Sequence, residues 1–126
     1  MLAEADVVTL NCELNESTRD LIDRDKIALM KPDAILVNAA RGGVLVEADL
    51  AAAIREGRLR GSGIDVFSVE PIRDDNPLLG LDRVVLTPHI AAISSDGFPA
   101  SVQRMIENFL AVIDGRPFPR DNDILV

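Results

Sequence analysis

The sequence contains no tryptophan and no tyrosine, and only 3% of its 126 residues are aromatic. Because 48% of the residues are hydrophobic, we expect a core built from aliphatic side chains. A single cysteine, Cys12, excludes a disulfide framework within the chain and is typical of a cytoplasmic protein. No apolar run is long enough to span a bilayer, and the first residues do not have the pattern of a secretory signal.

Basic residues are also fewer than acidic ones. The chain carries 13 basic and 21 acidic residues, which gives a formal net charge of −8, and the basic residues are scattered. Such a molecule repels nucleic acid and anionic membrane surfaces, so neither is expected as a partner. The length fits one ordinary domain and not two.

Four short apolar runs predict β-strands, at residues 7–10, 34–37, 62–67 and 83–87. These runs are continuously apolar and do not alternate with polar residues. That pattern is typical of parallel strands that are covered by helices on both faces of the sheet.

Helices are predicted between and after these strands, at residues 24–30, 47–56 and 101–114. Asp23 is a suitable N-cap for the first helix, and Gly57 is a suitable left-handed cap at the end of the second. Pro99 fits the first turn of the third helix, and Gly115 ends it. The alternation of strands and helices predicts an α/β, doubly wound layer of about four parallel strands with flanking helices.

Polar residues follow the ends of the predicted strands, where open parallel sheets bind their ligands. Arg41 follows the second strand, Asp65 and Glu70 follow the third, and His89 follows the fourth. The planar guanidinium of Arg41 can bind a carboxylate or a keto oxygen, and the imidazole of His89 can transfer a proton near neutral pH. Glu70 could hydrogen-bond the second imidazole nitrogen and fix the orientation of the ring.

Each of these residues also has an ordinary structural interpretation. Arg41 could belong to a surface loop, Glu70 to a solvated turn, and His89 could be a structural histidine. Asp65 is harder to explain in this way, because a carboxylate without a partner at the end of an apolar strand would be costly. The convergence of all four at one edge favours a site.

Four motifs then follow one another in a familiar order: NAARGGV at 38–44, GIDVF with EP at 63–71, NPLL at 76–79 and TPHIA at 87–91. This succession resembles the D-isomer-specific 2-hydroxyacid dehydrogenases, a family that includes glyoxylate/hydroxypyruvate reductases and phosphoglycerate dehydrogenases. The resemblance extends from residue 5 to about residue 117. It implies the C-terminal half of a Rossmann-type parallel sheet. Residues 1–117 would be a partial NAD(P)-binding domain, and residues 118–126 a C-terminal tail.

The activity implied by the resemblance is oxidation of the CH–OH group of D-2-hydroxy acids with NAD or NADP, or reduction of a 2-keto acid by hydride transfer. The partner would be a small 2-keto or 2-hydroxy acid. Arg41 would bind the carboxylate and the 2-oxygen of the substrate, His89 would be the acid and base, and Glu70 would pair with His89.

The resemblance further implies a set of residues around the nicotinamide, with Asp65 accepting a hydrogen bond from its carboxamide. No metal is implied. The residues expected to contact the cofactor are Cys12, Glu13, Ala39, Ala40, Arg41, Asp65, His89, Ile90, Ala91 and Ala92.

This sequence also departs from the family pattern. Asn11 and Glu13 stand where the family usually has histidine and proline, and Val46 replaces the aspartate that caps the following helix. The G-x-G-x-x-G turn that binds the pyrophosphate does not occur in the sequence. We therefore expect a fragment of an enzyme that is inactive by itself. Its first strand would have an unpaired edge, so we expect a homo-oligomer, a dimer for instance, or a marginally stable chain.

Two other interpretations stay open. The chain could be a non-catalytic binding or assembly module derived from such an enzyme, which has kept the fold and lost the reaction. A switch domain of the response-regulator kind is less well supported, because it needs a cluster of aspartates and Asp65 stands alone.

Overall fold

A computed structural model describes residues 1–93 and 97–117 of the chain. The chain divides into two compact units, Met1–Ala91 and Ala92–Val126. The first unit contains the whole β-sheet, and the predicted tail at residues 118–126 lies outside the described residues.

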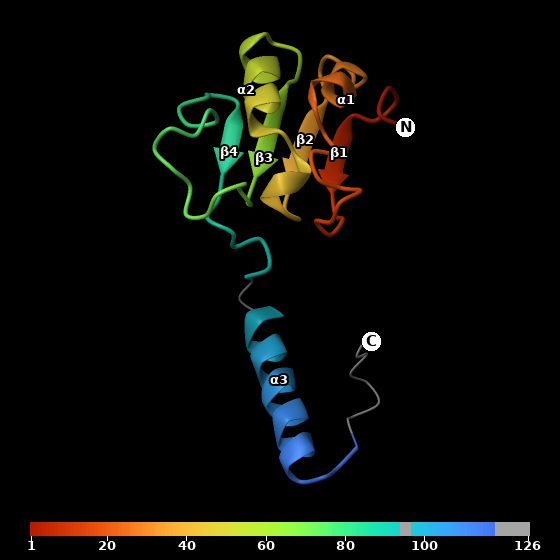
Figure 1. Ribbon diagram of the computed structural model, residues 1–126, viewed down its shortest axis with the longest axis vertical. Coiled ribbons are helices and arrows are strands. Elements are labelled where there is room, and N and C mark those ends of the chain that lie inside the picture. The colour runs from red at the N-terminus through yellow and green to blue at the C-terminus, as the bar shows by residue number, and fades with distance from the viewer. Residues whose placement is uncertain (94–96, 118–126) are drawn as a thin grey trace. The chain divides into compact units, whose positions relative to one another are not determined.

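Four parallel strands form one sheet in the order in which they occur along the chain. They are β1 (Val7–Leu10), β2 (Ile35–Asn38), β3 (Gly61–Ile64) and β4 (Val84–Leu86). Figure 1 shows their arrowheads pointing toward the same end of the unit. The predicted strands are confirmed, but β3 ends at Ile64, so that Asp65 lies just beyond the strand.

Two helices connect the first three strands, α1 (Arg24–Ala28) and α2 (Glu47–Arg55). The side chain of Asp23 accepts a hydrogen bond from the backbone N–H of Lys26 at 2.9 Å, which confirms it as the N-cap of α1. Gly57 has a φ of 72°, the left-handed conformation expected after α2. A short 3₁₀ helix, η1 (Gly42–Val44), precedes α2.

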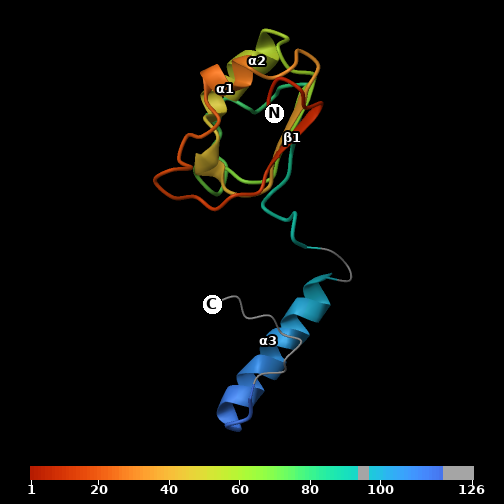
Figure 2. The ribbon, with the colours of Figure 1, turned by 90° about the vertical axis from the view of Figure 1, so that its right-hand side faces the viewer.

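Both helices lie on the same side of the sheet, as Figure 2 shows. This follows from the strand order, because two right-handed crossovers that move in the same direction place both helices on one face. Side chains on that face are buried, among them Leu10, Leu36 and Ile64, whereas Val7 and Val85 are 57% and 68% exposed. The expectation that helices cover both faces therefore differs from what the first unit shows.

The second unit contains α3 (Gly97–Ile113), a 17-residue helix that begins earlier than predicted. Pro99 lies in its first turn as expected, and Gly115 has a φ of 63° beyond its end. Large apolar side chains of α3 are exposed in this unit, with Met105 at 64% and Phe109 at 65%. Among the described residues, no helix is long and apolar enough to cross a membrane.

Candidate active site

The turn after β2 is held by the side chain of Asn38, which is 1% exposed. Its Nδ2 donates to the carbonyl oxygen of Arg41 at 3.0 Å, and its Oδ1 accepts from the N–H of Ala40 at 3.1 Å. Asparagine favours turns because its side chain can replace a backbone partner in this way. These two bonds fix the position at which Arg41 leaves the sheet.

The guanidinium of Arg41 is exposed and makes one hydrogen bond in the described part of the chain, from Nη1 to the carbonyl oxygen of Ala40 at 2.7 Å. An arginine has five N–H donors, so most of them are available to a ligand. This geometry suits a group that binds a carboxylate or a polarised carbonyl oxygen.

The turn after Arg41 packs directly against the segment after β3. A Cβ atom added to Gly42 would lie 1.9 Å from the carbonyl carbon of Phe67 and 2.3 Å from the nitrogen of Ser68. No side chain fits there without a backbone shift, since real Cβ atoms do not approach so closely. Glycine at position 42 thus allows Arg41 and the segment that carries Glu70 to lie side by side.

Asp65 is buried, with 5% of its surface exposed, and its carboxylate organises the segment after β4. Oδ1 accepts from the hydroxyl of Thr87 and from the N–H of Ile90 at 2.9 Å, and Oδ2 accepts from the N–H of Ala91 at 2.9 Å. Burial raises the pKa of Asp65, but these hydrogen bonds outweigh it and hold the pKa below its ordinary value. A carboxylate has about four acceptor positions, so about one remains for a ligand.

His89 lies between these partners in a conformation that is rare for any residue except glycine, with a φ of 55°. Its N–H donates to the carbonyl oxygens of Asp65 at 2.8 Å and Thr87 at 3.1 Å, which stabilises the turn. Left-handed residues other than glycine cost free energy and are concentrated at functional sites.

The imidazole of His89 pairs with Glu70, at 2.7 Å between Nδ1 and Oε2. The other oxygen of Glu70 accepts from the N–H of Phe67 at 2.9 Å. The hydrogen bond with His89 is the main reason that the pKa of Glu70 lies below its ordinary value, and the Phe67 N–H adds to this effect. Nε2 of His89 has no partner among residues 1–93 and 97–117 and can face a substrate.

Among the clefts that the described residues form at this edge of the sheet, two contain residues that the sequence predicted to line the site. The first brings together the three residues predicted to be catalytic, Arg41, Glu70 and His89. The second is lined by residues predicted to contact the cofactor, together with Asn11; they are Cys12, Glu13, Ala39, Ala40 and Arg41. Arg41 belongs to both linings, so the two clefts are neighbours.

The predicted cofactor contacts at residues 90–92 do not all lie in the same unit of the chain. Ile90 and Ala91 are held by Asp65 beside His89, as described above. Ala92 belongs to the second unit, so its contact with the cofactor stays a prediction. The same is true of the assignment of residues 92–117 to the nucleotide-binding domain.

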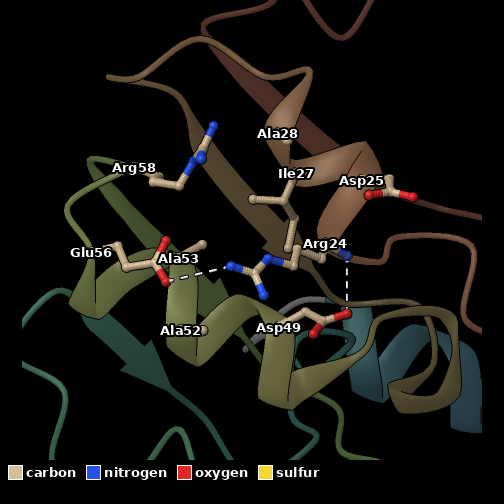
Figure 3. Close-up of a pocket in the computed structure, with 9 residues that line it drawn as sticks. All are labelled: Arg24, Asp25, Ile27, Ala28, Asp49, Ala52, Ala53, Glu56 and Arg58. Atoms are coloured by element: carbon tan, nitrogen blue, oxygen red, sulfur yellow. Dashed lines mark hydrogen bonds and ion pairs between the residues drawn. The ribbon is translucent and has the colours of Figure 1, made fainter.

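A separate groove lies between α1 and α2, and Figure 3 shows the residues that line it. Asp49 accepts a hydrogen bond from the N–H of Arg24 at 3.0 Å, and Nη2 of Arg24 lies 3.8 Å from Oε1 of Glu56. None of the predicted site residues lines this groove. Its contacts join the two helices to each other.

Sequence reasoning missed three residues of this region. Arg19 lines the cleft that contains His89, and its guanidinium makes no hydrogen bond or ion pair within the described residues. Thr87 hydrogen-bonds Asp65, and Glu47 bonds the segment around Glu70. Thr87 is the first residue of the TPHIA motif and could have been suspected from it. Arg19 and Glu47 are distant in sequence from their neighbours, so only the fold reveals their positions.

Residues 1–91 match the family model described as D-isomer specific 2-hydroxyacid dehydrogenase, NAD binding domain. A hydroxypyruvate reductase from Blautia hydrogenotrophica is 35% identical over 117 residues, which are 93% of this chain and 36% of that protein. The chain belongs to the D-isomer specific 2-hydroxyacid dehydrogenase family, and the part that matches is its NAD binding domain. The chain spans only about a third of the length of this relative.

Solved structures agree with this assignment. A D-isomer specific 2-hydroxyacid dehydrogenase from Xanthobacter autotrophicus Py2, in complex with NADPH and MES, superposes with a TM-score of 0.76 and 34% identity over 92% of this chain and 47% of that one. A D-lactate dehydrogenase with NAD+ from Lactobacillus jensenii superposes with a TM-score of 0.83 and 27% identity over 93% of this chain and 39% of that one. These neighbours confirm the predicted Rossmann-type parallel sheet.

The residues of the second cleft fit the nicotinamide end of such a cofactor. Ala39 and Ala40 have small side chains and leave the cleft open, and the carboxylate of Asp65 retains acceptor capacity nearby on the adjacent strand end. The sequence has no G-x-G-x-x-G turn for the pyrophosphate. An open lining with a carboxylate acceptor beside it is compatible with a carboxamide such as that of nicotinamide.

Proposed function

We propose that this chain provides the reacting side chains of an NAD(P)-linked oxidoreductase that interconverts a 2-keto acid and a D-2-hydroxy acid. The observation that carries the proposal is the pairing of His89 with Glu70 at 2.7 Å, in a cleft that Arg41 also lines. The family assignment supports the reaction class, since the relatives include a hydroxypyruvate reductase.

In this proposal Arg41 binds the carboxylate of the substrate and the oxygen at C2 through its unused N–H donors. His89 holds a proton at Nε2 and donates it to the keto oxygen during reduction, then accepts it during oxidation. Glu70 holds Nδ1 of the ring and balances the positive charge of the protonated imidazole. The bound nicotinamide supplies or receives the hydride at C2.

Asp65 has two roles in the proposed site. Its three hydrogen bonds hold Thr87, Ile90 and Ala91 and thereby the turn at His89. We further propose that its remaining acceptor position receives the carboxamide of the nicotinamide, which orients the ring. We also propose that the protein acts as a homo-oligomer, such as a dimer, in the cytoplasm, which the single cysteine and the open edge of β1 support.

The test is a titration of the chain with NADH and NADPH, followed by the fluorescence of the cofactor. The absence of tryptophan and tyrosine leaves this signal free of protein emission. Saturable binding that Asp65→Ala weakens is the result that supports the proposed nicotinamide site. Turnover of hydroxypyruvate or glyoxylate is then assayed, and any turnover would exceed the expectation that the chain is inactive by itself. His89→Gln should preserve the binding and reduce turnover by about 10²- to 10⁴-fold, since it removes the proton donor.

Turnover that survives His89→Gln would show that another group donates the proton. Failure to bind either cofactor at millimolar concentration, without turnover, would instead support the non-catalytic binding or assembly module.

A further inference from the structure

Glu47 is the first residue of α2, and its carboxylate accepts hydrogen bonds from residues outside that helix. Its Oε1 accepts from the backbone N–H of Ser68 at 2.6 Å, and its Oε2 accepts from Nδ2 of Asn76 at 2.7 Å. Both bonds are short, as is usual for hydrogen bonds to an ionised carboxylate. One side chain thus fastens two points of the segment that follows β3, on either side of Glu70.

That segment has little regular structure of its own to position Glu70. No helix lies between β3 and β4, and Glu70 is held locally by a single backbone donor, the N–H of Phe67. Glu47 adds an anchor at the residue next to Phe67. The close contact between Gly42 and Phe67 adds a second constraint, from the turn that carries Arg41.

We propose that Glu47 is a positioning residue, which holds the segment of Ser68 and Asn76 on α2 so that Glu70 remains hydrogen-bonded to His89. Its importance for turnover rests on the function proposed above. Its effect on the geometry of the pair does not, because the pair exists in the chain without substrate.

A simpler interpretation is that Glu47 is only a favourable negative charge in the first turn of α2. Asp49 makes the two interpretations distinguishable. It lies in the same first turn, carries the same charge and accepts one hydrogen bond, but its partner is the N–H of Arg24 on α1 and not the segment around Glu70. Asp49→Asn is therefore a matched control for Glu47→Gln.

The readout is the ionisation of Glu70, followed by NMR of the side-chain carboxyl carbons, with Glu70→Gln to assign the signal. His89 is the only histidine, so its ring protons report the state of the pair without overlap. In Glu47→Gln the pKa of Glu70 should rise toward its ordinary value of 4.5, and in Asp49→Asn it should not change. Equal shifts in both variants, or no shift in Glu47→Gln, would overturn the proposal.

Two further arms make the test decisive. If Glu47→Gln does not fold, Asn76→Ala removes one of the two anchors, and it should raise the pKa of Glu70 by a smaller amount; an unchanged pKa counts against the proposal. If the chain turns over a 2-keto acid, Glu47→Gln should reduce kcat by about tenfold to a hundredfold with little change in KM, as for a misplaced catalytic group. A wild type that binds neither NADH nor NADPH, together with the NMR shift, would reject the proposed function and retain the positioning role.

Discussion

Individual residues of the site are held mainly by carboxylates and by one close backbone contact. Asp65 holds the turn at His89, Glu70 holds the imidazole, and Glu47 holds the segment of Glu70. Of these three carboxylates only that of Asp65 is buried, and the loss of a buried acceptor leaves its donors unpaired at a cost larger than the net gain from the bond. Substitution of Asp65 should therefore affect stability as well as chemistry.

Asp65→Asn should lower the free energy of unfolding by about 1–3 kcal/mol at neutral pH, because the amide group faces backbone N–H donors. The pKa of Asp65 is below its ordinary value of 3.8 in the folded chain, so its stabilising contribution is complete above pH 3.8 and is lost as the pH falls through the folded value. Asp65→Asn should flatten this acid-side decrease. Urea unfolding between neutral and strongly acidic pH measures both effects.

The control for this experiment is Asp33→Asn, which makes the same change of charge at an exposed residue. It should leave the free energy of unfolding at neutral pH within about 0.5 kcal/mol of the wild type. An Asp65→Asn chain as stable as this control would mean that the carboxylate does not hold the turn.

Gly42→Ala should destabilise the chain by about 1–3 kcal/mol or more, since the added methyl overlaps the backbone of Phe67 and forces a shift. Gly63→Ala is the matched control, because its new methyl would meet only the side chain of Val37, at 3.9 Å. Thermal unfolding compares the two. Similar melting temperatures for both variants would contradict the close contact between Gly42 and Phe67.

The helices α1 and α2 are short, so hydrogen bonds that cap their ends contribute a large part of their stability. Val46 is the N-cap residue that precedes helix α2, and its side chain makes no capping hydrogen bond. Val46→Asp should stabilise the helix by about 1 kcal/mol, because its carboxylate can accept from an unpaired N–H of the first turn. Val46→Ala is the control, because it removes the methyl groups of valine without adding a carboxylate. Chemical denaturation gives the free energy of unfolding of both variants, and their difference is the contribution of the cap. A Val46→Asp chain no more stable than Val46→Ala would show that the cap does not form.

The elements were predictable because their signals are local. The apolar run at residues 7–10 became β1 with the same bounds, and Asp23 and Gly57 cap their helices as predicted. The predicted end of β3, at residue 67, is three residues too late. Val66 and Phe67 are apolar and buried, but they lie in the segment after the strand and do not pair with a neighbouring strand. Apolar character predicts burial, and it does not by itself distinguish a strand from the buried segment that follows it.

The site was only partly predictable for a related reason. Arg41, Glu70 and His89 follow strand ends, and the parallel order of the sheet brings them to one cleft. The roles of Arg19 and Glu47 depend on how loops fold back on the sheet, and no local pattern encodes this. Asp65 was identified, but its bonds to Thr87, Ile90 and Ala91 required the structure.

At the scale of the whole molecule, the outer edge of β1, which is unpaired within residues 1–93 and 97–117, and the net charge have opposite effects on association. The carbonyl oxygen of Asp6 accepts a hydrogen bond from the N–H of Ile35 on β2. Backbone groups alternate in direction along a strand, so those of Val8 and Leu10 also point toward β2 and those of Thr9 point toward the unpaired edge. An unpaired edge promotes association, while a net charge of −8 on each chain opposes it.

Association should therefore increase with salt, as the screening length falls from about 30 Å at about 0.01 M to about 3 Å at about 1 M ionic strength. Thr9→Pro should suppress it, because proline removes an N–H on the open side of β1 and leaves the bonds to β2 intact. Sedimentation velocity of both chains at low and high salt checks this. Equal association of Thr9→Pro and wild type would locate the contact elsewhere on the molecule.

The order of the four strands has a consequence for how the chain is made. Each strand pairs with the strand synthesised immediately before it, so the sheet can grow by successive additions while the polypeptide leaves the ribosome. Arg41 is in place after β2, and Asp65 and Glu70 arrive after β3. His89 follows β4 and is the last of them to emerge, so the imidazole meets its carboxylate only when the final strand has been added.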